Sequence, residues 1–494
     1  MNSDIFGTFC IIRLSHARGY GIIDVSKKWR KKMFNLSRRA FIANAAAAAS
    51  ARAFAGRAGG APNVTFGVLS DVHLERPGDE DTFLKALAYF RDGGADGVLV
   101  AGDIANTGRI EQLKRAADCF FRVFPGGKAP DGRAVEQLFV YGNHDVMNWG
   151  WRKGKDENYL REHSICSDPA KAWEQCFHEP YSPIWAKTVK GYTFIGAHWG
   201  NEKDLDAFLQ KNADRLNLRG GRPFFYTQHP HPGNTVQGPW AWGNDGGVAT
   251  RALEKFPNAV AFSGHSHYSI TDERSIWQGK FTSIGTSSLR YIFSQYWRDN
   301  GEDHNGIVKQ MRMLPESTGR QGMLVRVYDD RMAIERREFV YGESLGEDWV
   351  VPLDGSRPFA FEPRSEKKIA PAFASGAKVG VKRAKGRNRR GKETDQITVS
   401  FPAALPSATS RVHDYEVTAL AYHEDVDYPV ATKRVLSESY FLSPKREAKT
   451  GHIVFDVAEL KGVKEVRFAV RPLECFGHKG PEIYSQMFSL ADSK

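Results

Sequence analysis

The chain has 494 residues, too many for one ordinary domain, so we expect two domains with further segments outside them. A hydrophobic content of 41% supports a real core, whereas the lack of any run of eighteen apolar residues excludes a membrane-spanning helix. Of the formal net charge of +11, nine charges lie in residues 1–60, and residues 378–392 hold eight basic residues and no acidic one. The remaining sequence is therefore acidic, which argues against a nucleic-acid-binding surface.

The N-terminal segment resembles a twin-arginine export signal. Paired arginines stand in Ser37-Arg38-Arg39, an Ala-rich stretch follows, and Ala53-Phe54-Ala55 suits a signal peptidase. The resemblance implies export by the twin-arginine machinery to the periplasm or the cell exterior, with a mature N-terminus near Gly56. A leader of ordinary length would start at Met33, so the residues before it form an upstream extension. The alternative is an Ala-rich amphipathic helix that packs on the folded protein.

Removal of this leader leaves four cysteines, Cys119, Cys166, Cys176 and Cys475. An even number in an oxidising compartment permits disulfides, and Cys166 with Cys176 is the favoured pair. Four buried free thiols are the alternative, because a large domain does not need covalent links.

The first part of the mature chain alternates strands with helices. Val64–Leu69, Gly97–Ala101 and 138–141 are apolar runs of strand length, and 79–91 and 110–124 carry apolar residues at helical spacing. This βαβαβ pattern predicts an α/β sheet with its ligand site at the C-terminal ends of the strands. Further strands are expected at 192–198, 223–227, 259–262 and 281–284, with a closing hairpin at 324–328 and 332–340.

Two later segments differ in composition. Residues 147–185 are irregular and rich in aromatic side chains, which indicates an insertion beside the site, and 375–395 reads as a solvated basic linker. Beyond the linker, short alternating runs predict a small β-sandwich similar to fibronectin or immunoglobulin modules. These runs are 396–401, 415–422, 433–442, 452–457 and 465–472.

Polar residues of the same three types, Asp, Asn and His, follow five of the predicted strands. They are Asp71 and His73, Asp103 after Gly102, Asn143-His144-Asp145 after Gly142, His229, and His265 and His267 after Gly264. Carboxylates, imidazoles and an amide without a thiolate suit divalent ions such as Mn, Fe or Zn. Seven candidate ligands are too many for one open site, but they suit two ions that share a carboxylate.

In this order the five blocks resemble the calcineurin-like metallophosphoesterase superfamily, over roughly residues 64–340. The resemblance implies a four-layer αββα sandwich with a dinuclear centre of divalent transition-metal ions. It also assigns the ligands: Asp71, His73 and His267 to the first metal, Asn143, His229 and His265 to the second, and Asp103 as the bridge. The block around His229 departs from the usual pattern, since the position two residues before the Pro is Gln228, so Gln228 and His231 stay open as alternatives.

Such a pair of ions, about 3.5–4 Å apart, would polarise a bound phosphate and hold a water between them as hydroxide, the nucleophile. The resemblance places His144 toward the substrate, where it would protonate the leaving oxygen. Asp145 is expected to orient His144 and to favour its protonated form. For the pocket rim we expect Trp240, which could stack on a base or sugar, and Arg290, which could bind phosphate.

The sequence thus predicts an exported phosphoester hydrolase that acts on a small-molecule substrate, a phosphodiester first. Its segments are an extension and signal over 1–60, a catalytic domain over 61–345, a connecting segment over 346–395 and a β-sandwich over 396–494. A phosphomonoesterase or nucleotidase is the alternative within enzymes. A nuclease steered by the basic segment is a further enzymatic alternative, and a non-catalytic exported binding protein is the alternative outside enzymes.

Overall fold

The structure is a computed structural model that describes residues 60–490, apart from 147–167, 240, 295–301, 305–307, 312, 315–318, 389, 424–425, 447 and 461. The predicted export signal, Cys166 and Trp240 therefore lie outside the described residues. The chain divides into two compact units, Met1–Ala61 and Pro62–Lys494, and every element below belongs to the second unit.

The first sheet of this unit contains the predicted parallel strands β1 (Val64–Leu69), β2 (Gly97–Ala101) and β3 (Glu136–Val140). The predicted closing hairpin is confirmed, because β14 (Gln321–Val327) pairs antiparallel with both β1 and β15 (Arg331–Glu338). The strand order is β16-β15-β14-β1-β2-β3, and β17 also pairs with β15. The outer strands are β16 (Glu343–Ser344) and β17 (Trp349–Pro352), so the sheet continues past residue 345, where the sequence had placed the boundary.

The second sheet has the order β4-β5-β6-β7-β9-β8. Its inner strands β5 (Tyr192–Ala197), β6 (Phe224–Thr227), β7 (Ala259–Ser263) and β9 (Thr282–Gly285) lie where the sequence predicted strands, and they run parallel. The edge strands β4 (Ile184–Val189) and β8 (Ile276–Gln278) are antiparallel to their neighbours.

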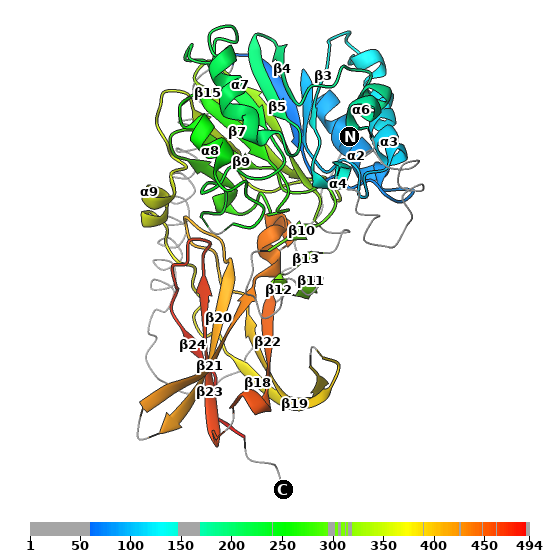
Figure 1. Ribbon diagram of the computed structural model, residues 1–494. Helices are drawn as coiled ribbons and strands as arrows, with labels where there is room; N and C mark the ends of the chain where they lie inside the picture. The colour runs from blue at the N-terminus through cyan, green and yellow to red at the C-terminus, as the bar shows by residue number, and fades with distance from the viewer. Residues whose placement is uncertain are drawn as a thin grey trace, which may run out of the picture. The chain divides into compact units, whose positions relative to one another are not determined.

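Three apolar clusters hold these sheets and their helices together. One cluster joins the two sheets, and in it the ring of Phe66 on β1 lies 4.9–5.8 Å from the rings of Phe194, Phe225 and Phe262 on the second sheet. A second cluster packs the first sheet against α2 (Glu80–Asp92), α3 (Ile110–Val123) and α6 (Pro169–Phe177). A third packs the second sheet against α7 (Leu205–Asn212) and α8 (Val248–Leu253), and Figure 1 shows the two groups of helices apart from each other.

The aromatic stretch 147–185 is only partly described, and its described part is not a rim insertion. Trp173 on α6 is 3% exposed and belongs to the core of the first sheet. Trp185 on β4 donates from its indole N–H to the backbone oxygen of Phe139, so it also packs inward. Cys176 is a free buried thiol, as are Cys119 and Cys475, and so the expected disulfide is not formed at Cys176.

The C-terminal β region, residues 379–490, consists of two antiparallel sheets around a common apolar cluster. One sheet has the order β18-β19-β22 and the other β21-β20-β23-β24, with β25 on β23. Their bounds are β18 (Gly380–Arg387), β19 (Glu393–Pro402), β20 (Asp414–His423), β21 (Val426–Leu436), β22 (Thr450–Asp456), β23 (Glu465–Leu473), β24 (Ile483–Tyr484) and β25 (Phe488–Ser489).

Two expectations for this region need correction. The basic segment is not a solvated linker, since 380–387 form β18 and pair with β19 along their whole length. Lys and Arg are suited to such an edge strand because their charges oppose pairing with another chain. The predicted strand 433–442 ends early, at Leu436, and a short 3-10 helix, η6 (Glu438–Phe441), follows.

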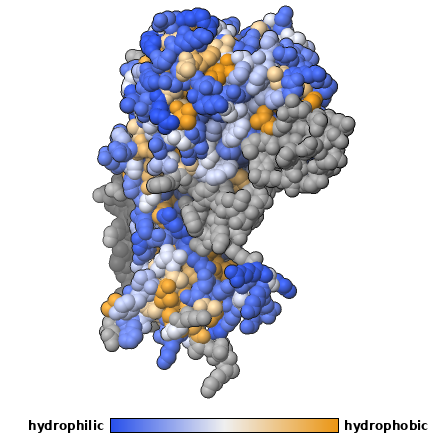
Figure 2. All heavy atoms as spheres, in the orientation of Figure 1, coloured by the Kyte–Doolittle hydropathy of each residue, from blue (hydrophilic) through white to orange (hydrophobic). Residues whose placement is uncertain are grey.

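The remaining elements are short. The strands and α-helices among them are α4 (Asn143–Val146), β10 (Ile292–Phe293), β11 (Glu302–His304), β12 (Val308–Met311), β13 (Met313–Leu314) and α9 (Phe361–Glu366). None of the helices in the described part of the chain is long and apolar enough to cross a membrane. The described residues on the face drawn in Figure 2 form a mostly hydrophilic surface with small, separate apolar areas.

Candidate metal centre

The polar residues that follow the parallel strands of both sheets meet at one place. Their ligand atoms form three overlapping groups, and within each group all atoms lie within 4.8 Å of one another. The groups are Asp71, His73 and His267; His73, Asp103 and His144; and Asp103, His229 and His265. The two sheets therefore contribute jointly, because His229, His265 and His267 follow β6 and β7 whereas the others follow β1, β2 and β3.

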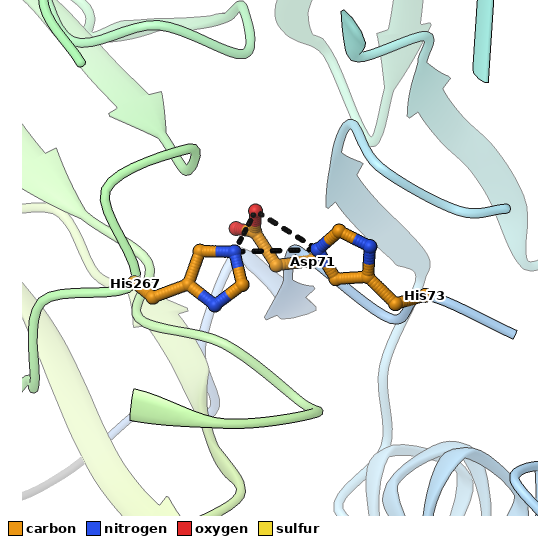
Figure 3. A group of neighbouring side chains, drawn as sticks. All are labelled: Asp71, His73 and His267. Atoms are coloured by element: carbon orange, nitrogen blue, oxygen red, sulfur yellow. Dashed lines mark hydrogen bonds and ion pairs between the residues drawn. The ribbon is translucent and has the colours of Figure 1, made fainter. Parts of the chain in front are cut away.

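The first group places one carboxylate between two imidazoles (Figure 3). Asp71 Oδ1 is 3.0 Å from Nε2 of His267 and 3.8 Å from Nε2 of His73, and the two Nε2 atoms are 3.2 Å apart. All three side chains are buried, with exposed fractions of 0–4%. His267 donates its other ring N–H to the backbone oxygen of Tyr291, 2.8 Å away, an arrangement that orients metal-ligating histidines.

The geometry around Asp103 favours His229, which the sequence had preferred over the alternatives Gln228 and His231. Nε2 of His229 is 3.0 Å from Asp103 Oδ2, and its Nδ1 donates to the backbone oxygen of Ala101 at 2.7 Å. Gln228 points elsewhere, because its amide donates to Pro230 O and to Asp245. His231 is engaged by the hydroxyls of Ser263 and Ser266. Of the three alternatives, only His229 faces the carboxylates.

The backbone at the site adopts conformations that side chains other than glycine rarely take. Asp71, His73, Asp103, His265 and His267 all have positive φ, between 48° and 72°. Such residues cost free energy and persist only where surrounding contacts hold them, so they concentrate at functional sites.

Each glycine of the sequence motifs lies against a candidate ligand. A Cβ on Gly102 would lie 2.5 Å from Nδ1 of His229, and a Cβ on Gly264 would lie 2.5 Å from Oδ2 of Asp71. A Cβ on Gly142 would overlap Asp103 Oδ1. These glycines are therefore needed for close packing around the ligands.

The charges of the group are unusual for a protein interior. Burial lowers the pKa of His73 to about 4 and that of His265 to about 3, so both rings are neutral and offer a lone pair. Burial also acts on His229, but Asp103 and Asp71 outweigh it and raise the pKa of His229 to about 9. Burial would raise the pKa of Asp71, yet His267 and His73 hold it well below its usual range. The carboxylates thus stay ionised and require nearby positive charge.

The donor set fits a pair of divalent ions. Ligand atoms about 2.1 Å from one ion are roughly 3.0–3.4 Å apart at octahedral or tetrahedral angles. The two imidazole pairs, His73–His267 and His229–His265, have nitrogen separations of 3.2 Å, and His267 and His229 each lie 3.0 Å from a carboxylate, which agrees with this range; His73 lies farther from Asp71, at 3.8 Å. Among the described residues, Oδ1 of Asn143 is buried and accepts no hydrogen bond, which leaves it available as a ligand.

The structure corrects the role expected for Asp145. Its carboxylate is fully buried and accepts from the backbone N–H of Gly142, Ile104 and Ala105, at 2.7–3.2 Å. Asp145 therefore ties the loop after β3 to the loop after β2. The acceptor that orients His144 is instead the backbone oxygen of Asn106, 2.7 Å from Nδ1.

The expected substrate contact of Arg290 is also corrected. Arg290 is 5% exposed, and its guanidinium donates to the backbone oxygen of His73 and to the carboxylate of Asp79, 2.5 and 2.7 Å away. Its charge is therefore neutralised inside the protein, where it fixes the loop after His73. The other expected rim residue, Trp240, lies outside the described residues.

Aromatic rings lie against the candidate ligands, two of them stacked, and the sequence reasoning missed a third, Trp199, which is tilted. The rings of Trp242 and Tyr291 lie nearly parallel to those of His265 and His267, with centroids 4.7 and 4.4 Å apart. Trp199, which follows β5, lies 5.4 Å from His265. Its place at the C-terminal end of a parallel strand was the signal that could have found it.

Part of the chain matches one known protein family. Residues 64–269 match the calcineurin-like phosphoesterase family. No curated protein matches the chain. Among solved structures, a dimetal phosphatase from Danio rerio is similar at 13% identity and a TM-score of 0.36, over 59% of this chain and 100% of that chain. GAP50, the anchor in the inner membrane complex of Plasmodium, is similar at 10% identity and a TM-score of 0.35, over 58% of this chain and 88% of that chain.

Proposed function

We propose, from the calcineurin-like phosphoesterase domain that the chain carries, that the protein hydrolyses phosphodiesters at a centre of two divalent metal ions. The observation that carries the proposal is the set of buried ligand atoms contributed by five strand ends. Asp71, His73 and His267 would hold one ion, Asn143, His229 and His265 the other, and Asp103 would bridge them. When bound, such ions supply Lewis acidity to the phosphoryl oxygens and activate a water.

His144 is the residue of the chain best placed to move a proton. Because its Nδ1–H is committed to the backbone oxygen of Asn106, a proton that leaves the protonated ring leaves from Nε2. We infer that Nε2 protonates the leaving oxygen, which avoids release of a strongly basic alkoxide. The backbone N–H of His144 donates to Asp103 Oδ1 at 2.8 Å. This hydrogen bond fixes the position of His144, the proposed acid, relative to Asp103, the proposed bridging ligand.

The pairing of Arg290 supports a diester rather than a monoester. A phosphomonoester is a dianion near neutral pH and gains from an additional cationic side chain, whereas a diester carries one negative charge. Arg290 is the arginine that the sequence placed at the rim, and its charge is already balanced by Asp79. Within the described residues, Arg290 therefore adds no unbalanced positive charge for a second phosphate charge, which supports the substrate with less charge.

The test compares two substrates on one preparation. The protein, isolated without chelator, is analysed for metals and then assayed with bis(p-nitrophenyl) phosphate and p-nitrophenyl phosphate. We expect about two transition-metal ions per chain and a higher kcat/KM for the diester. Absence of metal after careful isolation would contradict the metal centre, and a preference for the monoester would favour the phosphomonoesterase or nucleotidase alternative.

Two further parts of the proposal concern architecture and location. The apolar clusters between and outside the two sheets support the four-layer αββα sandwich, and the two antiparallel sheets of the C-terminal β region support a fibronectin- or immunoglobulin-like module. The motif Ser37-Arg38-Arg39 supports export by the twin-arginine machinery to the periplasm or the cell exterior. N-terminal sequencing of exported protein should begin near Gly56, and a retained Met1 would contradict export with cleavage.

A further inference from the structure

The segment that carries two of the candidate ligands is bound by residues far away in the chain. We call residues 264–275 the histidine loop; it begins with His265 and His267 and ends in the 3-10 helix η5 (Glu273–Ser275). His265 and His267 have φ values of 72° and 55°, which the loop would not keep without external contacts. What holds this loop therefore decides whether the two imidazoles face the carboxylates.

The first restraint is the side chain of Gln321, at the start of β14, which is fully buried. Its Oε1 accepts from the hydroxyl of Ser269 and the backbone N–H of Ile270, both in the histidine loop and both at 3.0 Å. The same oxygen accepts from the hydroxyl of Ser287, another residue with positive φ. One amide oxygen thus connects the histidine loop to the turn after β9.

The other end of the same amide reaches the C-terminal β region. Nε2 of Gln321 donates to the backbone oxygen of Phe441, the last residue of η6, at 3.0 Å. This contact is dry, because Phe441 belongs to a buried apolar cluster with Ile292, Leu436 and Tyr440. The amide donor is paired in the C-terminal β region and the amide acceptor is paired in the histidine loop. A buried side chain held in this way couples the positions of the two segments.

The second restraint is a buried ion pair that the C-terminal β region completes. Asp272, in the histidine loop, accepts from Nε and Nη2 of Arg274 at 3.0 and 2.6 Å. Nε2 of His413, from the C-terminal β region, lies 3.3 Å from Asp272 Oδ2 and 3.1 Å from Nη2 of Arg274. His413 is in turn fixed through Nδ1 by Asp414, at 2.9 Å. Asp272 and His413 are each 3% exposed, so water does not replace these contacts.

We propose that the C-terminal β region is a structural part of the metal centre, and that Gln321 and His413 are positioning residues through which it holds the histidine loop in its ligand-presenting conformation. The inference rests on the proposed function, because it takes His265 and His267 to be ligands. It predicts that a change at the contact with the C-terminal β region weakens metal binding without altering any ligand.

The test measures Mn²⁺ binding to the full-length, metal-stripped protein by calorimetric titration, together with its unfolding temperature. Gln321→Met keeps the length of the side chain but removes its polar contacts, and we expect Mn²⁺ affinity to fall about 10- to 100-fold, the range found when partners of metal ligands are removed. His413→Phe removes only the second restraint and should lower the affinity by less, roughly 10-fold.

Two more variants separate positioning from general stability. Gln321→Glu keeps the acceptor oxygen for the histidine loop but loses the donor to Phe441, so its Mn²⁺ affinity should lie between those of wild type and Gln321→Met. Arg446→Met is the matched control, because Arg446 pairs with Glu343 across the same two regions but at an exposed position away from the histidine loop. Its Mn²⁺ affinity should stay within twofold of wild type, even if the unfolding temperature falls.

The possible failures are distinct. If the wild-type protein binds none of Mn²⁺, Fe²⁺ and Zn²⁺ in the same titration, the proposed function fails. If it binds Mn²⁺ and the Gln321 and His413 variants bind it equally well, the inference is overturned and these residues serve stability alone. If Gln321→Met does not fold, Gln321→Glu and His413→Phe decide the question by the same criterion.

Discussion

The two sheets of the catalytic part and the two sheets of the C-terminal β region treat polar residues in opposite ways. At the strand ends of the catalytic part, Asp71, His73 and His229 are fully buried, and several neighbours adopt positive φ. In the C-terminal β region the strands alternate, with residues such as Val417 and Phe468 in the common cluster and the intervening side chains more exposed. The second pattern favours folding, whereas the first opposes it.

This contrast shows that the strand ends of the catalytic part are the place where folding stability is reduced in favour of function. Burying an ionisable group is costly unless it is paired, and a backbone in the left-handed region adds to the cost. Natural sequences carry such violations mainly at functional sites, where other contacts compensate. The C-terminal β region supplies some of that compensation if Gln321 and His413 hold the histidine loop.

The largest effect is expected at the proposed bridging ligand. Asp103→Ala removes the carboxylate shared by two groups of ligand atoms. We expect hydrolysis of bis(p-nitrophenyl) phosphate to fall at least about 10⁴-fold, because the loss of Lewis acidity removes several kcal/mol of transition-state stabilisation. Metal analysis should show fewer ions per chain, and a variant with full metal content and activity would disprove the bridge.

His144 distinguishes proton transfer from metal binding. His144→Ala should lower kcat by about 10³-fold, since general acid catalysis contributes on this scale, while the metal content stays near that of wild type. The prediction is checked by measuring both the metal content and the kcat of the variant. Loss of the metals would instead assign His144 as a ligand, as its place in one of the groups of ligand atoms permits.

A pair of glycine variants compares the two regions directly. Gly142→Ala places a Cβ against Asp103, and we expect kcat/KM to fall about 10²-fold because misplacement by about 1 Å has this effect. Gly451→Ala places a Cβ against the ring of Phe401 in the C-terminal β region, and overpacking there should cost about 1–3 kcal/mol of unfolding free energy. Its kcat/KM should stay within twofold of wild type, and equal losses of activity in both variants would remove the distinction.

The last prediction concerns a buried carboxyl group beside the site, whose effect on stability depends on pH. Burial raises the pKa of Glu202 from 4.5 to about 7, and Oε1 has no hydrogen-bond partner among the described residues. The folded state therefore holds this proton more tightly than the unfolded state does, so the free energy of unfolding falls as the pH rises from about 4.5 to 7.

Glu202→Gln should remove this dependence. At pH 8 the variant should gain up to about 3 kcal/mol of unfolding free energy relative to wild type, and at pH 5 the difference should be much smaller. Urea unfolding at both pH values measures it, with Glu111→Gln, an exposed position on α3, as the control. An equal difference at both pH values would show that the Glu202 carboxyl does not titrate on unfolding.

Much of the catalytic part could be predicted because its signals are local. The strands Val64–Leu69 and Gly97–Ala101 were predicted with the bounds that the structure has, since buried parallel strands are short apolar runs. The candidate ligands follow these strands directly, so the topology rule for open α/β sheets was enough to bring them together. The basic segment was wrongly predicted as a linker, because an edge strand with charged side chains has a composition similar to that of a linker.

The contacts of Arg290, Asp145 and Gln321 could not be predicted from the sequence pattern. All three are polar residues near the site in sequence or in space, yet Arg290 pairs with Asp79, Asp145 binds three backbone N–H groups, and Gln321 binds partners from several loops. Their partners are mostly tens to hundreds of residues away in the chain. A pattern of residues that are neighbours in the sequence does not predict contacts between such distant segments.

Chemical type and order along the chain were therefore sufficient to predict which polar residues come together as candidate ligands, because the C-terminal ends of parallel strands lie at one edge of a sheet. The sequence preferred His229, but setting aside Gln228 and His231, and assigning Arg290 and Asp145 to structural contacts, required the folded chain. So did the link from the histidine loop to the C-terminal β region, since burial and long-range hydrogen bonds arise only when distant segments pack together.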